Sequence, residues 1–247
     1  MAPCRHQAPV ARRAPWLAAA ILSFVLAGPV PAQDDASDAY HQALANYKAG
    51  HYDAALAMVG DAEQQAPGDP NTEILKCRIL TELGHYDLAK KALDTLEGNP
   101  HLTPADGQNW TMAYGDLCLR KKDYAGAIKS YQSLASALPD DADLTLRLVY
   151  ACIGAGDLPH ALSYASKLKP LDQVNPSYYF AHAALAEATG KSADADNDIE
   201  TVRTIYGITV TNRYLRTYLQ ATSHTAPKSG LVPKPAPNSE APAGNQP

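Results

Sequence analysis

A tetrapeptide that occurs twice, in the same frame as three looser copies, constrains the fold of this chain more than any other feature. The sequence Gly-His-Tyr-Asp at residues 50–53 is repeated at residues 84–87. The same frame continues less strictly from Lys122, Gly156 and Gly190, so three of the four intervals are equal and the second is longer. Self-similarity with a period of about 20 to 50 residues is typical of repeat architectures. We therefore expect five structural units, one of which is longer by four residues.

Each turn position is followed at fixed distances by a small residue and then, in most units, by a bulkier one. The small residues are Ala55, Ala89, Ala127, Ala161 and Ala195. The residues four positions later are Val59, Leu93, Tyr131, Ala165 and Ile199, so only the fourth unit departs from the pattern. A glycine at the turn permits a positive φ where one helix ends. The alanine then lets two helices approach closely, and the bulky side chain fills the space beneath.

These positions resemble the tetratricopeptide repeat. The resemblance implies an all-α fold, a right-handed α-solenoid of about five helix-turn-helix repeats within residues 33–222. The Trp-x2-Leu-Gly-x2-Tyr half of the family pattern is poorly kept, since Trp110 lies one place out of frame. The four extra residues coincide with turn formers between Gly98 and Pro104, so we expect the expansion in a loop between helices.

Residues 208–222 are predicted to form a capping helix over the last repeat, because a solenoid needs a cap at its end. The apolar positions at helical spacing are Tyr214, Leu215, Tyr218 and Leu219. The positions expected to face water are Arg213, Arg216 and Gln220.

Residues 1–32 have the order of an export signal. Arg5, Arg12 and Arg13 stand without any acid, and residues 16–28 form an apolar stretch. That stretch is short of the roughly 20 residues that span a bilayer. We expect cleavage after Ala32, export to the periplasm and no stable membrane insertion afterwards. The alternative is an uncleaved N-terminal anchor.

The other end of the chain, residues 223–247, is predicted to be a disordered tail. Six prolines lie between residues 227 and 247 together with alanine, serine, asparagine and glycine. Such a composition cannot supply a packed core.

The motifs of the chain do not indicate catalysis, and its charge does not indicate a nucleic-acid partner. The sequence contains no Cys-x2-Cys, no His-x3-His, no P-loop and no Gly-x-Ser-x-Gly, so we expect no enzyme activity, no cofactor and no metal. The net charge of −5 argues against nucleic acid as a partner. Cys77, Cys118 and Cys152 are interpreted as small buried side chains rather than disulfide partners.

In the tetratricopeptide family the first helix of each unit lines a concave groove that receives an extended peptide or a partner helix. Carried over to this chain, the resemblance gives a partner-binding groove lined by Tyr40, Tyr47, Lys48, Arg78, Met112, Arg120, Arg147, Tyr150 and Phe180. The simpler alternative is that Arg78 and Asp116 pair across adjacent helices as surface charges of little energetic consequence.

The resulting hypothesis is a periplasmic or envelope-associated interaction module or scaffold. Its partner would be a protein or peptide that the sequence does not identify. Two alternatives remain: an accessory subunit of cell-wall or polysaccharide biosynthesis or of secretion machinery, and an enzyme without a recognisable motif.

Overall fold

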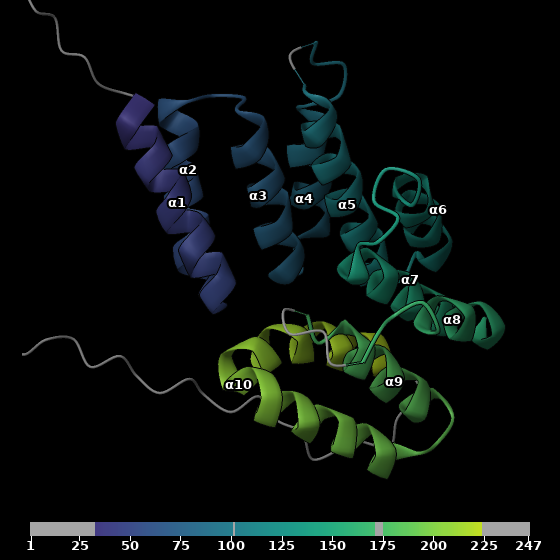
Figure 1. The fold of residues 1–247 in the computed structure, drawn as a ribbon. Coiled ribbons are helices and arrows are strands. Elements are labelled where there is room, and N and C mark those ends of the chain that lie inside the picture. Colours follow the sequence, from purple (N-terminus) through teal and green to yellow (C-terminus); the bar gives the residue numbers. More distant parts are fainter. Residues whose placement is uncertain (1–32, 101, 171–174, 224–247) are drawn as a thin grey trace, which may run out of the picture. The chain divides into compact units, whose positions relative to one another are not determined.

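A computed structural model describes residues 33–100, 102–170 and 175–223 of the chain. Within these ranges the regular secondary structure is helical and no strand occurs (Figure 1). The helices are α1 (Gln33–Ala49), α2 (Tyr52–Gln65), α3 (Pro70–Glu82), α4 (Tyr86–Asp94), α5 (Pro104–Arg120), α6 (Tyr124–Leu134), α7 (Ala142–Gly154), α8 (Leu158–Ala165), α9 (Ser177–Ala188) and α10 (Ser192–Thr222). The predicted signal peptide, and the predicted tail apart from Ser223, lie outside the described residues.

The helices of the described residues pair in chain order into five units, which confirms the predicted all-α repeat fold (Figure 1). The second helices of the units begin at residues 52, 86, 124, 158 and 192. These starts reproduce the intervals that the sequence predicts, including the longer second one. Each second helix packs on the first helix of its own unit, and first helices of successive units are also in contact.

The turn between the two helices of each unit has a left-handed residue at the predicted position. Gly50, Gly84, Gly156 and Gly190 have φ values between 75° and 83°. In the third unit Lys122 takes the same place with φ 64°, the only positive φ of a non-glycine residue in the described part of the chain. The turn geometry is therefore kept even where the glycine is lost.

Burial of small residues holds the two helices of each unit together. All five predicted alanines, from Ala55 to Ala195, are 0% exposed. In the third unit Gly115 faces the ring of Tyr131, and a β-carbon at Gly115 would stand 2.5 Å from Cε1 of that ring. Only glycine fits there, because a closer approach than about 3 Å would force the tyrosine or the helix to move.

The four extra residues of the third unit are in a helix, so the prediction that they lie in the loop near Gly98 is wrong. Helix α5 has 17 residues, whereas α3 and α7 have 13 each. A capping box between Thr103 and Asp106, with Pro104 at the first helical position, begins α5 one turn early. Four residues are close to one helical turn of about 3.6 residues, so the faces of α5 stay in register with the neighbouring helices.

Helix α10 consists of two helical segments that meet at Gly207, whose φ of 80° and ψ of 168° interrupt the helical geometry. Residues 192–206 follow α9 as the second helix of the fifth unit, as the repeat predicts. Residues 208–222 form the predicted additional helix. Its contacts extend beyond the last repeat to α7 in the fourth unit. None of the helices in the described part of the chain is long and apolar enough to cross a membrane.

Candidate functional site

Two ion pairs join the first helices of the second, third and fourth units. Arg120 on α5 pairs with Glu82 on α3, and their side chains are only 8% and 13% exposed. Asp116, one turn before Arg120, accepts a 2.7 Å bond from Nε of Arg147 on α7. Residues four apart in a helix share a face, so these four side chains lie along one face of the array. We call these four residues the inner ladder.

The inner ladder is held by further hydrogen bonds. The hydroxyl of Tyr131 donates to Oδ1 of Asp116 at 2.8 Å, and Nη1 of Arg147 donates to the backbone oxygen of Asp143 at 3.2 Å. Burial alone would lower the pKa of Arg147, but the Asp116 carboxylate and neighbouring groups raise it above its ordinary value. Asp116 is therefore engaged with Tyr131 and Arg147, and the pairing of Asp116 with Arg78 that was the simpler alternative is not the one found.

At the first two units, the face that carries the inner ladder presents aromatic and basic side chains. Tyr40, Tyr47 and Arg78 are half-buried, whereas Lys48 is exposed. Burial, aided by the charge of Glu82, raises the pKa of Tyr47 well above its usual range, so its hydroxyl remains a hydrogen-bond donor. Nε of Arg78 is buried and has no hydrogen-bond partner among the described residues.

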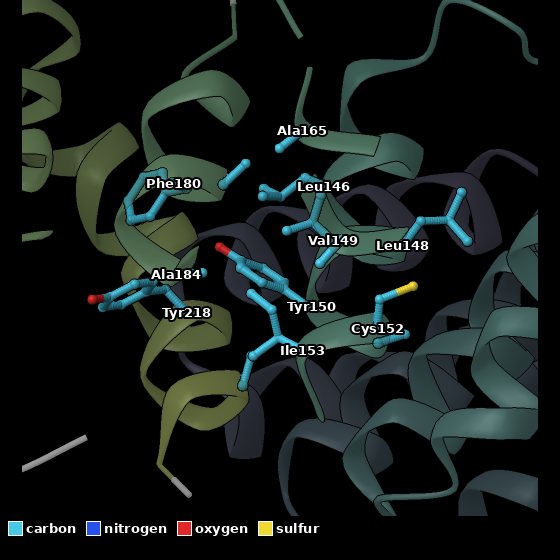
Figure 2. Packing of buried hydrophobic residues seen from close by; sticks show 14 of the residues in the cluster. Leu146, Leu148, Val149, Tyr150, Cys152, Ile153, Ala165, Phe180, Ala184 and Tyr218 are labelled. Atoms are coloured by element: carbon cyan, nitrogen blue, oxygen red, sulfur yellow. The ribbon is translucent and has the colours of Figure 1, made fainter. Parts of the chain in front are cut away.

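In the fourth and fifth units the corresponding face is covered by the helix of residues 208–222. Tyr150 and Phe180 are 1% and 0% exposed and belong to one apolar cluster with Tyr218 (Figure 2). The ring of Phe180 stacks on Tyr214 at 5.4 Å between centroids and meets Tyr218 at 5.9 Å. A helix of the chain therefore lies against two of the predicted groove positions.

Asp143 on α7 anchors this covering helix. Its Oδ1 accepts hydrogen bonds from Tyr214 at 2.8 Å and from Asn175 and Ser177 at 2.9 Å each. Burial raises the pKa of Asp143, but the charge of Arg147 and the three donors outweigh burial, so the pKa lies below its ordinary value. The carboxylate stays charged and accepts bonds from the start of the fifth unit and from the covering helix.

The structure distributes the nine predicted groove residues over four environments. Arg120 and Arg147 are members of the inner ladder, and Tyr150 and Phe180 are buried beneath residues 208–222. Met112 is partly buried against the apolar cluster of the later units. The remaining four, at the first two units, are Tyr40, Tyr47, Lys48 and Arg78. Their role in binding a partner stays a prediction.

Sequence reasoning missed the roles of three residues that organise this face, namely Asp143, Tyr52 and Arg216. The prediction that Arg216 faces water is wrong, since it is half-buried with its guanidinium carbon 4.7 Å from the ring centroid of Tyr52. A β-carbon at Gly50 would stand 2.8 Å from Nη2 of Arg216. Gly207 is the signal that could have indicated this arrangement, because a glycine directly before a helical pattern permits a change of chain direction.

The described residues hold no cluster of three or more metal-ligating side chains. Cys77, Cys118 and Cys152 are free and buried. Burial raises the pKa of Cys77 to about 12 and that of Cys152 to about 11, which disfavours the reactive thiolate.

Five two-helix units in succession, with ion pairs between the first helices of the second, third and fourth, define an α-helical repeat protein. The tetratricopeptide repeat profile matches residues 46–100 and 119–188 of the chain. The protein therefore belongs to the tetratricopeptide repeat family, whose fold suggests a protein-protein interaction module.

Solved structures of other repeat proteins have the same fold. The tetratricopeptide repeat protein TTC0263 of Thermus thermophilus is 18% identical with a TM-score of 0.60, over 74% of this chain and 99% of that one. A tetratricopeptide repeat protein of Parabacteroides merdae is 16% identical with a TM-score of 0.59, over 74% of this chain and 71% of its own. No match was found among curated protein sequences.

Proposed function

We propose that this protein is an exported interaction module that binds a segment of a partner protein on the face carrying the inner ladder. The observation that carries the proposal is the inner ladder itself. Its charged side chains are held by ion pairs between successive first helices and do not have to be ordered when a partner arrives. Preorganised side chains lower the entropic cost of binding.

The part of this face at the first two units offers the partner its contacts. Tyr40 and Tyr47 provide aromatic area with few rotatable bonds, and Arg78 can donate to a carboxylate or a backbone carbonyl. Lys48 adds a positive charge at the exposed edge. The partner segment should therefore carry an apolar or aromatic side chain next to an acidic group.

The proposed location is the periplasm or the bacterial envelope, and it rests on the order of basic, apolar and small residues in positions 1–32. Intact mass spectrometry of the protein purified from its native compartment should give the mass of a chain that begins at Gln33. A mass that includes residues 1–32 would replace this location with an anchored one.

Binding at the first two units is tested with two sets of variants. The partner is first captured from envelope extract by cross-linking to the purified protein, and its affinity is then measured by calorimetry. Tyr40→Ala combined with Arg78→Ala should weaken binding by about 2 kcal/mol or more if both are anchors. The control Lys90→Ala with Lys129→Ala changes two exposed residues of second helices and should leave the affinity unchanged. A larger loss of affinity in the lysine control than in the Tyr40 and Arg78 variant would place the partner on the opposite face.

A further inference from the structure

The helix of residues 208–222 lies against the same face that the proposed function assigns to a partner. The main chain at Gly207 permits this placement, since its φ of 80° is a conformation that other residues rarely adopt. A β-carbon at Gly207 would meet no atom within 4 Å. The hydroxyl of Thr211, inside the helix itself, donates a 2.8 Å hydrogen bond to the backbone oxygen of Gly207. The helix is thus connected to the fifth unit through a single left-handed residue.

The buried face of this helix has the pattern of a helix bound in a groove. Its most buried positions recur at spacings of four, three and four residues. They are Thr211, Leu215, Tyr218 and Thr222. Arg213 and Gln220 are exposed. Anchors at i, i+4 and i+7 are how an amphipathic helix enters a groove.

This helix leaves a hydroxyl group of the receiving face, on α7, unsatisfied. The hydroxyl of Tyr150 is buried and has no hydrogen-bond partner among the described residues. An unpaired buried hydroxyl loses the hydrogen bonds that it makes with water. A different helix with an acceptor at this point would gain a hydrogen bond that residues 208–222 do not provide.

The far end of the helix borders an open cleft. The cleft has a volume of about 280 Å³ and lies between residues 217–223 and the turns of the second and third units. Its walls include Tyr86, Arg120 and Lys122 on the side of the repeats. An incoming segment can contact these residues before the covering helix has moved.

We infer that residues 208–222 are a built-in occupant of the groove and that the partner is an amphipathic helix that replaces them. Such a helix would present an aliphatic and an aromatic residue at the spacing of Leu215 and Tyr218, with a hydrogen-bond acceptor facing Tyr150. The inference rests on the proposed function, since it places the partner on the same face, and it extends the binding site from the first two units to the last two.

Hydrogen exchange on the full wild-type chain tests whether the helix can leave. The amides of residues 208–222 should exchange at least tenfold faster than those of α7 and α9, because the helix opens without unfolding the repeats. Exchange at the same rate as α7 would make the helix a permanent part of the fold and overturn the inference.

A synthetic peptide of residues 208–222 with a fluorescent label tests whether the vacated groove accepts a helix from outside. Tyr214→Phe in the full chain removes the bond to Asp143 from the built-in helix, while the peptide keeps its own tyrosine. The Tyr214→Phe chain should bind the peptide about tenfold more tightly than the wild-type chain does. This factor corresponds to the loss of one hydrogen bond to a charged group in the built-in helix. The control Arg213→Ala, on the exposed side of the helix, should change peptide affinity less than twofold.

Equal peptide affinity for Tyr214→Phe and wild type would overturn the inference, provided that hydrogen exchange shows α7 and α9 still folded. A Tyr214→Phe dimer that binds no peptide, detected by light scattering, would also overturn it, because a second copy would then be the occupant. Either result leaves the proposed function standing if Tyr40→Ala with Arg78→Ala still weakens the partner. If the peptide results are as expected but Tyr40→Ala with Arg78→Ala does not weaken the partner, the proposed function is refuted instead.

Discussion

The hydroxyl of Tyr214 donates a 2.8 Å hydrogen bond to Oδ1 of Asp143, a residue 71 positions earlier in the chain. The same oxygen also accepts from Asn175 and Ser177, so one carboxylate connects α7, the start of α9 and the helix of residues 208–222. Asp143 is mostly buried and its hydrogen bonds favour the charged form. The free energy of unfolding should therefore fall when acid protonates this carboxylate.

Asp143→Asn should flatten that pH dependence. The pKa of Asp143 is lower in the folded protein than the value of about 3.9 expected in an unfolded chain. Its contribution to stability is therefore complete above about pH 4 and is lost as the pH falls through the lower, folded pKa. Urea unfolding at a series of pH values should show a steeper acid loss in wild type than in the variant. The exposed Asp140→Asn serves as control and should behave like wild type.

Arg216→Ala should lower the free energy of unfolding by about 1 kcal/mol, since it removes a cation that lies over an aromatic ring. Urea unfolding compared with Arg213→Ala, an exposed arginine of the same helix, isolates this contact from the general loss of charge. Equal effects of the two substitutions would mean that the contact with Tyr52 contributes nothing.

Lys122→Gly should raise stability by about 0.5 to 1 kcal/mol because Lys122 has a φ of 64°, a conformation in which a side chain is strained. Its neighbour Lys121 has helical geometry with φ −74°. Lys121→Gly should therefore lower stability by about 1 kcal/mol. Thermal melts of the two variants should move in opposite directions, and a shift of the same sign in both would contradict the assigned strain.

Gly115→Ala should destabilise the third unit by about 1 to 3 kcal/mol, since its β-carbon would overlap the buried ring of Tyr131. Gly107→Ala in the same helix meets no atom within 4 Å and should instead stabilise by about 0.5 to 1 kcal/mol. Circular dichroism melts of both variants check this difference in stability. Equal melting temperatures would mean that α5 shifts away from α6 to make room for the β-carbon.

Iodoacetamide should leave Cys77, Cys118 and Cys152 unmodified in the folded protein near neutral pH. All three are buried, and burial raises the pKa of each thiol. After unfolding in urea without reductant, mass spectrometry should find all three alkylated. Failure of Cys118 and Cys152 to react there would reveal a disulfide and would contradict the positions of α5 and α7.

The repeated part of the fold could be predicted because its signals are local. Gly50, Gly84 and the alanines that follow them mark each turn and each close helix contact within one period of sequence. The position of the extra turn in α5 was predicted wrongly, since Gly98 and Pro104 equally suit a longer loop and a helix that begins early. The capping box at Thr103 and Asp106 decides between the two.

The covering of the groove by residues 208–222 could not be predicted in the same way. The helical spacing of apolar residues around Leu215 indicates a helix with one buried face, but it does not indicate which surface buries that face. The contacts of Tyr214 with Asp143 and of Arg216 with Tyr52 join distant segments and leave no periodic pattern in the sequence. For the same reason the predicted groove included Tyr150 and Phe180 without the helix that covers them.

The contact between Arg216 and Tyr52 also changes how the array is expected to fold. In a chain of repeats that touch only their neighbours, folding can begin in any unit and spread, and the end units fray independently. Here the last helix reaches the turn of the first unit, so the two ends of the array lose stability together. That pairing adds contacts of high sequence separation, which slow folding because the intervening chain must be ordered first.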